Sequence, residues 1–317
     1  MEMSAEQTIT KTYRSGFIAL VGRPNVGKST LINQLLGEKL AITSPVAQTT
    51  RNRLRAILTT SNGQLILVDT PGIHKPHHLL GEKLVKSAKS SIGEVDVVVF
   101  LVDASQKPGK GDFFIINLLK NIQIPVLVVL NKWDLVQESI HLKRGNEYQD
   151  LCKDSKWPLL KCSGFNGKGC KDLITKMTHY LPIGPQLYPP EMKTDQPEKI
   201  LIAELIREQV LLGTREEIPH SVAVRIDRIE DIPCKSKKLD KKVRTAVLAT
   251  ILVERKSQKA ILIGKGGSML KVIGKGARLQ MQRLIDGQVY LELFVKVVPD
   301  WRSKPARLAE LGYKLNS

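Results

Sequence analysis

The sequence contains a glycine-rich segment whose residue types suit the binding of phosphate. Residues 22–29 read Gly-Arg-Pro-Asn-Val-Gly-Lys-Ser and match the pattern G-x-x-x-x-G-K-[ST]. In such a loop, consecutive backbone N–H groups surround a phosphate, and the helix that follows points its positive end at the same charge. Lys28 would add a point charge, and Ser29 a hydroxyl that can bind Mg²⁺. The segment therefore predicts a nucleoside triphosphate site.

Two further segments add the chemistry of a guanine nucleotide site. Asp69-Thr-Pro-Gly72 follows an apolar run, and its carboxylate suits a contact with Mg²⁺ while Gly72 offers an unobstructed N–H to a terminal phosphate. Asn-Lys-Trp-Asp follows another apolar run at 131–134. A carboxylate at Asp134 can accept two hydrogen bonds from the N1–H and 2-amino groups of guanine, which adenine lacks. The three segments together predict selection of GTP over ATP.

These segments resemble the Era family within the TrmE–Era class of P-loop GTPases. The resemblance rests on residues 22–30, 43–51, 69–76 and 131–134. It implies GTP/GDP and Mg²⁺ as ligands, a first switch loop at 43–51 with Thr50 as metal ligand and Thr49 as the alternative, and a base-binding loop at Ser163-Gly164, where relatives have Ala in the second position. The residues expected to bind GTP are Gly22, Arg23, Pro24, Asn25, Val26, Gly27, Lys28, Ser29, Asp69, Thr70, Pro71, Gly72, Ile73, Asn131, Lys132, Trp133, Asp134 and Ser163. The expected metal ligands are Ser29, Thr50 and Asp69, and the expected catalytic groups are Lys28, Asn25, Thr50 and Gly72.

One position informs the mechanism. In Ras-like GTPases a Gln after the Asp-x-x-Gly motif orients the attacking water, whereas this chain has Ile73, which forms no hydrogen bond to water. Unaided hydrolysis is therefore expected to be slow. In relatives with Asn at the position of Asn25, that side chain helps to hold K⁺ near the β- and γ-phosphates, so the resemblance makes K⁺ dependence an open hypothesis.

The elements that position these residues alternate in type along the chain. Runs that are apolar throughout alternate with amphipathic stretches, a pattern typical of a mostly parallel sheet with helices on both faces. A weaker alternation at 54–60 predicts an additional strand at a sheet edge. The expected strands are 17–21, 65–68, 95–102, 124–130 and 158–161, and the expected helices are 28–36, 79–92, 112–121 and 172–180.

The segment 182–197 contains five prolines in sixteen residues and predicts a linker. We expect a disordered lead-in at 1–15, an α/β GTPase domain at 16–182, the linker at 183–197 and a second domain at 198–317. The second domain is expected to run helix, two strands, two helices, strand and a short helical tail. Gly274-Lys-Gly276 is expected to mark a bend in its last long helix.

The second domain contains Gly264-Lys-Gly-Gly267 between two expected helices, a pattern that lets a nucleic-acid backbone approach closely. By itself the pattern is weak, but the residues around it resemble a KH domain, and the element order is that of a type II KH domain, a small α+β fold. The resemblance implies a groove for about four unpaired nucleotides. The expected RNA-binding residues are Ile261, Gly264, Lys265, Gly266, Gly267 and Lys271. Ile261 and Ile263 suit either the groove or the core, and the basic run 235–244 suits either a solvated loop or a phosphate contact.

The charge is concentrated in this second domain. The net charge of the chain is +18, and residues 234–317 contribute +13 of it, which indicates a polyanionic partner. The four cysteines lack Cys-x-x-Cys spacing, which favours free thiols over a zinc site, and His74, His77 and His78 have no Cys, Asp or Glu close by to complete a metal site. No apolar run is long enough for a membrane span, and residues 1–15 lack the apolar core of a secretory signal.

The resemblance implies a slow GTPase that binds the 3′ end of small-subunit (16S) ribosomal RNA and assists biogenesis of the small (30S) ribosomal subunit. It implies a cytoplasmic monomer without an obligate protein partner and with peripheral contact to the cytoplasmic face of the inner membrane. Two alternatives stay open at this stage. One is an RNA-binding assembly module whose nucleotide site is only structural, and the other is a GTPase directed to tRNA or DNA.

Overall fold

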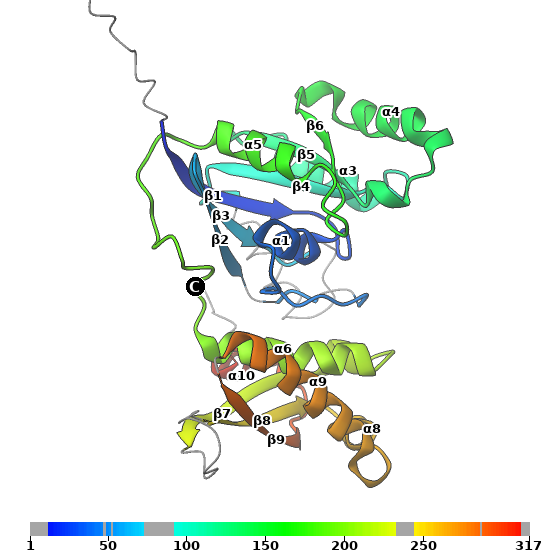
Figure 1. Ribbon diagram of the computed structural model, residues 1–317. Helices are drawn as coiled ribbons and strands as arrows, with labels where there is room; N and C mark the ends of the chain where they lie inside the picture. The colour runs from blue at the N-terminus through cyan, green and yellow to red at the C-terminus, as the bar shows by residue number, and fades with distance from the viewer. Residues whose placement is uncertain are drawn as a thin grey trace, which may run out of the picture.

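The computed structural model describes residues 12–46, 49–51, 53–72, 92–232, 244–285 and 287–311, which form a larger N-terminal and a smaller C-terminal unit (Figure 1). The first unit is built on a six-stranded sheet in the order β2-β3-β1-β4-β5-β6. Its strands are β1 (Arg14–Val21), β2 (Leu54–Thr60), β3 (Gly63–Asp69), β4 (Val97–Asp103), β5 (Val126–Asn131) and β6 (Leu159–Lys161). All pairs are parallel except β2 with β3. The predicted parallel sheet and its edge strand are confirmed.

Helices cover both faces of this sheet, which is why every residue of β3, β4 and β5 is buried. Helices α1 (Lys28–Leu36) and α5 (Cys170–Tyr180) pack on one face, and α3 (Lys110–Leu119) and α4 (His141–Cys152) on the other. The sequence did not predict α4. The helix expected at 79–92 lies, apart from Ile92, outside the described residues.

The second unit has a three-stranded sheet in the order β7-β8-β9, with β7 antiparallel and β9 parallel to β8. Its elements are α6 (Glu198–Gly213), α7 (Ile218–Ser221), β7 (Ala223–Ile232), β8 (Arg244–Val253), α8 (Lys256–Ile263), α9 (Ser268–Leu284), β9 (Gln288–Val297) and α10 (Pro305–Glu310). The predicted order is confirmed, with the short α7 in addition. Helices α6 and α9 pack on one face of this sheet.

The prediction of a bend near Gly274 and Gly276 is wrong, because α9 runs unbroken from Ser268 to Leu284. The surroundings of Gly276 differ from those expected at a helix bend. A Cβ atom at this position would lie 2.1 Å from Oε1 of Gln209 on α6, so the Gln209 side chain lies over this glycine and would have to move for a larger residue.

The proline-rich segment between the units lies against the first sheet. Its backbone accepts a hydrogen bond from the Ile57 N–H of β2 through Lys193 O at 2.8 Å, and Thr194 forms a bridge with Ala56. The buried side chain of Gln64 also binds this segment, accepting from the backbone N–H groups of Leu187 and Tyr188 at 2.8 and 2.9 Å. We call residues 182–196 the strap. It is attached to the sheet at several points along its length.

Candidate nucleotide site and nucleic-acid surface

The phosphate loop lies between β1 and α1, so the N-terminus of α1 faces the space that the loop surrounds (Figure 1). Lys28 is buried, and its Nζ donates to the carbonyls of Gly22 and Arg23 at 3.5 and 3.2 Å. Burial lowers the pKa of Lys28, and the nearby carboxylate of Asp69 opposes this shift. The ammonium group is thus held over the loop, where an anionic phosphate would strengthen its charged form.

The three predicted metal ligands meet beside this loop. Ser29 Oγ lies 2.9 Å from Thr50 Oγ1 and donates to Asp69 Oδ2 at 2.7 Å, and Thr50 Oγ1 donates to the same oxygen at 3.1 Å. The other oxygen, Asp69 Oδ1, is buried without a hydrogen-bond partner. Burial raises the pKa of Asp69, with Lys28 opposing the shift. Two hydroxyls and a carboxylate suit Mg²⁺, so the residues fit that ion.

The structure favours Thr50 over Thr49 as the metal ligand. Thr49 turns away and donates its hydroxyl to Val46 O at 2.6 Å. Asn25 has a left-handed backbone with φ of 64°, and its Nδ2 donates to Pro45 O at 2.8 Å, so it joins the phosphate loop to residues 43–46.

Between these groups lies a solvent-open cleft with about 400 Å³ of empty space, lined by both loops and by Gly72. A Cβ atom at position 72 would lie 2.8 Å from Pro24 N, so only glycine lets this backbone pass so close to the phosphate loop.

The predicted base-binding residues gather at the ends of β5 and β6. Asn131 is buried; it donates through Nδ2 to Val26 O at 2.7 Å and accepts through Oδ1 from the Gly164 N–H at 2.9 Å. One side chain therefore connects the phosphate loop with the loop after β6. Lys132 donates to Asp103 Oδ2 at 2.6 Å, and the carboxylate of Asp134 is exposed, where it can meet a ligand.

The loop after β6 explains the glycine that departs from the family pattern. A Cβ atom on Gly164 would lie 2.9 Å from Leu31 Cα of α1, so alanine would not fit without a backbone shift. Ser163 is buried, and its Oγ accepts from the N–H groups of Phe165 and Asn166 at 3.3 and 3.2 Å, which shapes the loop.

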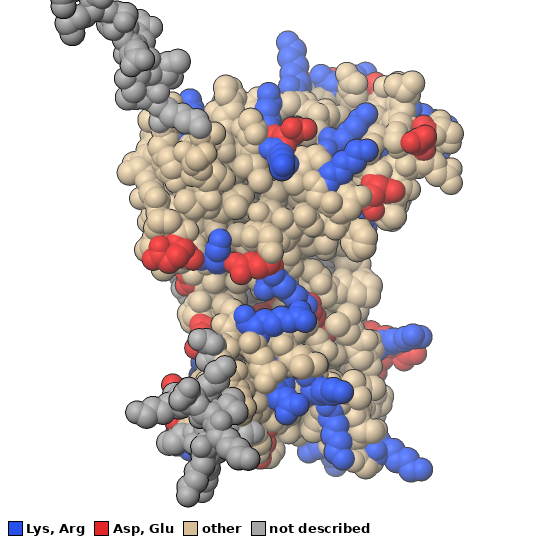
Figure 2. Space-filling model, viewed as in Figure 1, with Lys and Arg blue, Asp and Glu red and all other residues tan. Residues whose placement is uncertain are grey.

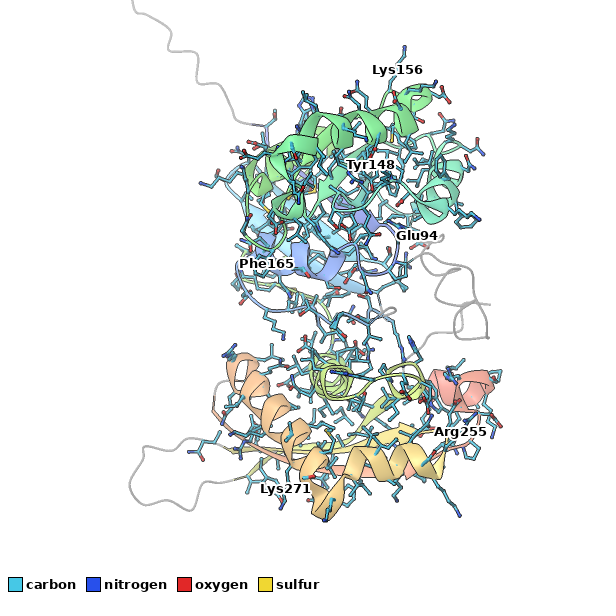
Figure 3. The ribbon with its side chains drawn as sticks, turned by 90° about the vertical axis from the view of Figure 1, so that its right-hand side faces the viewer. Glu94, Tyr148, Lys156, Phe165, Arg255 and Lys271 are labelled. Atoms are coloured by element: carbon cyan, nitrogen blue, oxygen red, sulfur yellow. The ribbon has the colours of Figure 1, made fainter. Side chains whose placement is uncertain are left out.

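Phe165 was not singled out from the sequence. Its ring is 82% exposed, and it belongs to the expected base-binding loop on the first unit (Figure 3). An exposed aromatic ring has a flat face on which a purine can stack. The only sequence signal was its place directly after Ser163-Gly164.

The other predicted nucleotide residues make contacts that hold the loops of the site in place. Arg23 forms an ion pair with the buried Asp112 of α3 at 2.9 Å, and Thr70 donates to Leu20 O at 2.6 Å. Trp133 is buried under the ammonium group of Lys161, 4.6 Å from the ring centroid. The structure places Pro24, Val26, Gly27 and Pro71 along the same two loops. Ile73 and the three histidines at 74, 77 and 78 lie outside the described residues.

The predicted RNA loop connects α8 to α9. Gly264, Gly266 and Gly267 have φ of 71°, 59° and 79°, values that favour glycine. No atom within 4 Å would meet a Cβ on Gly266 or Gly267, so the loop backbone is open to a ligand. Lys265 within this turn and Lys271 in the first turn of α9 are both exposed, and Lys271 lies at the end of the molecule far from the first unit (Figure 3).

The side chains around this loop form an open surface. Ile261 is 50% exposed and suits the groove, whereas Ile263 packs against the core of the second unit. Val272 of α9 is also exposed, at 65%. In Figure 2 basic side chains lie over both units, and several of them lie over the second unit. The basic run 235–244 lies, apart from Arg244, outside the described residues. A solvated loop and a phosphate contact therefore both stay open for it.

The first switch loop is also part of the contact between the two units. Arg51 is 3% exposed and donates to three carbonyls of the second unit, Val222 at 2.6 Å and Pro219 and His220 at 3.1 Å. Ile42 packs in the hydrophobic core of the second unit. The loop that contains Thr50, the predicted metal ligand, thus contacts the second unit through Ile42 and Arg51.

Glu208 of α6 connects this loop to the RNA surface. Its carboxylate is fully buried and accepts from Lys39 Nζ at 2.6 Å, the Thr43 N–H at 2.7 Å and Gln280 Nε2 of α9 at 2.7 Å. Helix α9 begins directly after the Gly264–Gly267 loop. Residues 39 and 43 and the helix that follows the predicted RNA loop therefore share one buried carboxylate.

Comparisons with known proteins agree with this architecture. The family of 50S ribosome-binding GTPases matches residues 17–132, and the KH domain family matches residues 217–302. The GTPase Era of a Nostoc species is 57% identical, with 96% of this chain and 90% of the relative covered. That of a Synechocystis species is 53% identical, with 96% and 93% covered.

Two solved structures resemble the whole chain. A crystal structure of Era with MgGDPNP and nucleotides 1506–1542 of 16S ribosomal RNA is 39% identical, with a TM-score of 0.89, covering 96% of this chain and 100% of that one. Era from Aquifex aeolicus bound to GDP and aluminium fluoride is 38% identical, with a TM-score of 0.88, covering 95% and 100%. The predicted P-loop GTPase and KH folds are confirmed, and this chain belongs to the Era GTPase family.

Proposed function

We propose that this protein is a nucleotide-controlled RNA-binding factor that holds the 3′ end of small-subunit ribosomal RNA during assembly of the small subunit. The observation that carries the RNA-binding part is the glycine loop 264–267, with three positive φ angles, an open backbone and Lys265 and Lys271 beside it. The solved relative bound to nucleotides 1506–1542 of 16S ribosomal RNA supports this target.

At the nucleotide site, we propose a separate role for each of the residues that the two loops bring together. Mg²⁺, when bound by Ser29, Thr50 and Asp69, neutralises charge on the outer phosphates. Lys28 places a cation on the same phosphates, and the Gly72 N–H binds the terminal one. Asp134 selects guanine, and Ser163 fixes the loop that covers the base. Asn25 provides the position for K⁺.

Coupling between the two sites follows from the contact between the units. The terminal phosphate and its metal ion act on Thr50, which is adjacent to Arg51 in the chain. Arg51 and Glu208 transmit the state of this loop to the second unit. We propose that GTP and GDP therefore set different RNA affinities, which the alternative of a purely structural nucleotide site does not allow.

The experiment is RNA binding by fluorescence anisotropy, with the last 37 nucleotides of small-subunit ribosomal RNA, a scrambled RNA, a tRNA and a DNA of the same length. We expect preferential binding of the first RNA. The double substitution Lys265→Asp with Gly266→Asp should abolish it, because two carboxylates would face the phosphate backbone. Lys171→Asp, on α5 of the first unit, is the matched control. Equal binding of tRNA or DNA would refute the proposed target.

The cellular setting is part of the proposal. Among the residues that the structure describes, no helix has the length and apolar character needed to cross a membrane. We propose a monomer that acts in the cytoplasm, tested by sedimentation at micromolar concentration. The net charge of +18 supports a further proposal of peripheral contact with anionic membrane. Co-flotation with anionic vesicles tests this contact, and absence of the protein from the floated fraction would refute it.

A further inference from the structure

Two cysteines lie at the two ends of the loop that is proposed to cover the guanine base. Cys162 directly follows β6, and Cys170 is the first residue of α5. Their Sγ atoms are 3.5 Å apart, and both side chains are buried, with 1% and 7% exposure. Neither thiol is among the predicted nucleotide ligands, although Cys170 Sγ also donates to Ser163 O of the same loop at 3.8 Å. The pair therefore encloses residues 163–169 in a short segment of chain whose ends already touch.

The backbone is shaped to bring the two thiols together. Gly169 has φ of 78°, and a Cβ atom there would lie 2.2 Å from Lys161 O and 3.3 Å from Cys162 Cα. A glycine thus lets the chain return against the end of β6 directly before Cys170. Because a disulfide has an S–S bond of about 2.05 Å, the two sulfurs would have to approach by only about 1.5 Å.

The two thiols differ in reactivity. Cys170 lies at the N-terminus of α5, where the backbone N–H groups and the helix dipole favour a thiolate. The hydrogen bond between the two thiols lowers the pKa of Cys170 and, together with burial, raises the pKa of Cys162. Cys170 is thus the attacking group, and Cys162 is the thiol that resolves the intermediate.

We infer that Cys162 and Cys170 form a reversible disulfide that switches the affinity of the guanine-binding loop. The oxidant is a peroxide. The Cys170 thiolate attacks one oxygen of H₂O₂, the O–O bond breaks, and the leaving hydroxide takes up a proton to become water. Cys162 then attacks the sulfenic sulfur, and its proton leaves with the displaced hydroxide as a second water. Two electrons pass from the sulfurs to the peroxide, and a dithiol reverses the reaction.

The closed disulfide would act on the nucleotide through contacts that the structure shows. The Gly164 N–H is bound by Asn131, which also binds Val26 O of the phosphate loop, and Gly164 lies against Leu31 of α1. Drawing the loop ends together displaces these contacts. We expect about tenfold weaker binding of guanine nucleotide, corresponding to the loss of one hydrogen bond. This inference rests on the proposed role of residues 163–169.

The experiment uses the full chain with C152S and C234S, so that only this pair of thiols is left. After treatment with H₂O₂, the intact mass should fall by two hydrogens. The Kd for fluorescent GDP should rise about tenfold and return with dithiothreitol. C170S and C162S in the same background are the matched controls, because neither can form the disulfide, and their Kd should not respond to peroxide.

Each outcome decides the inference. No loss of two hydrogens refutes the disulfide, and a disulfide that leaves the Kd unchanged refutes the switch. A peroxide response in C170S assigns the effect to another site and also refutes it. A failure of the proposed base-binding role would look different. In that case the fully reduced protein would bind GDP no more tightly than the variant Asp134→Ala.

Discussion

Replacement of Glu208 by glutamine tests whether the contact between the two units transmits the nucleotide state. Glutamine has the same shape and can still accept from the Thr43 N–H through its oxygen. Its amide nitrogen would then face Lys39 Nζ and Gln280 Nε2, which are both donors and lie 2.6 and 2.7 Å from the present oxygen. The ion pair with Lys39 is therefore replaced by a contact between two donors, whereas Gln280 can turn its amide and accept through Oε1, which has no hydrogen-bond partner in the present structure.

The size of the effect follows from these contacts. Hydrogen bonds to charged groups contribute about 1.5–3 kcal/mol each, but the Lys39 side chain is 34% exposed, so solvent screens its share. We expect a loss of about 1.5–2 kcal/mol at this contact, the lower part of the range for one such hydrogen bond, because only the Lys39 interaction is lost. Couplings between ligand sites are typically about 1–3 kcal/mol. The loss is thus comparable to the whole coupling between nucleotide and RNA.

The assay is the ratio of RNA dissociation constants measured with a non-hydrolysable GTP analogue and with GDP. In Glu208→Gln this ratio should fall to about one, while GDP affinity, measured separately, changes little. Glu198→Gln is the matched control, since it makes the same chemical change at an exposed position on the same helix. A ratio that stays at the wild-type value in Glu208→Gln would refute the reasoning, as would an equal loss in Glu198→Gln.

Three further predictions concern the nucleotide site. Turnover in KCl should exceed that in NaCl at equal ionic strength by about tenfold or more if K⁺ replaces an arginine finger; Asn25→Ala should remove the difference, and equal wild-type rates would refute the hypothesis. Asp134→Asn should weaken GTP binding about 100-fold, because the amide can accept from N1–H only as a neutral group and its NH₂ opposes the 2-amino group; it should favour xanthosine triphosphate, whose 2-oxo group accepts from that NH₂, and equilibrium binding of both nucleotides measures the change. Gly164→Ala should lower both the free energy of unfolding and GDP affinity, since its methyl group would lie 2.9 Å from Leu31 Cα. Gly145→Ala on α4, where a Cβ meets nothing within 4 Å, should instead stabilise by about 0.5–1 kcal/mol; denaturant unfolding that ranks the two variants equally would contradict this account.

Much of the first unit could be predicted because its signals are local. The strands β3, β4 and β5 are buried on both faces and are apolar throughout. The phosphate loop follows its strand directly. Helix α4 was missed because its inward face contains few apolar residues. It is anchored by Tyr148, whose hydroxyl donates to Asp103 O at 3.0 Å, and by a buried Arg144. Neither residue produces the apolar periodicity by which a helix is predicted.

Contacts between distant parts of the chain could not be predicted from local sequence patterns. Arg51 was expected only as the end of a switch motif, yet its guanidinium lies buried among carbonyls of the second unit. Glu208 looked like one more charge on an amphipathic helix. A buried charge of this kind is defined by partners far away in the sequence, which no window of residues contains. The glycine at 276 was misinterpreted for the same reason, because α6 lies more than sixty residues earlier.

The strap has a consequence for how far the second unit can move. A free linker of sixteen residues would let the two units separate widely, at a low effective concentration. Here the Ile57 N–H binds Lys193 O, and Arg55 forms an ion pair with Asp195 at 2.7 Å, so the attached chain ends just before α6. The second unit is therefore tethered by only a few free residues and redocks as a fast intramolecular step. By pairing with β2, the strap also covers the exposed edge of the sheet and protects it from pairing with another molecule.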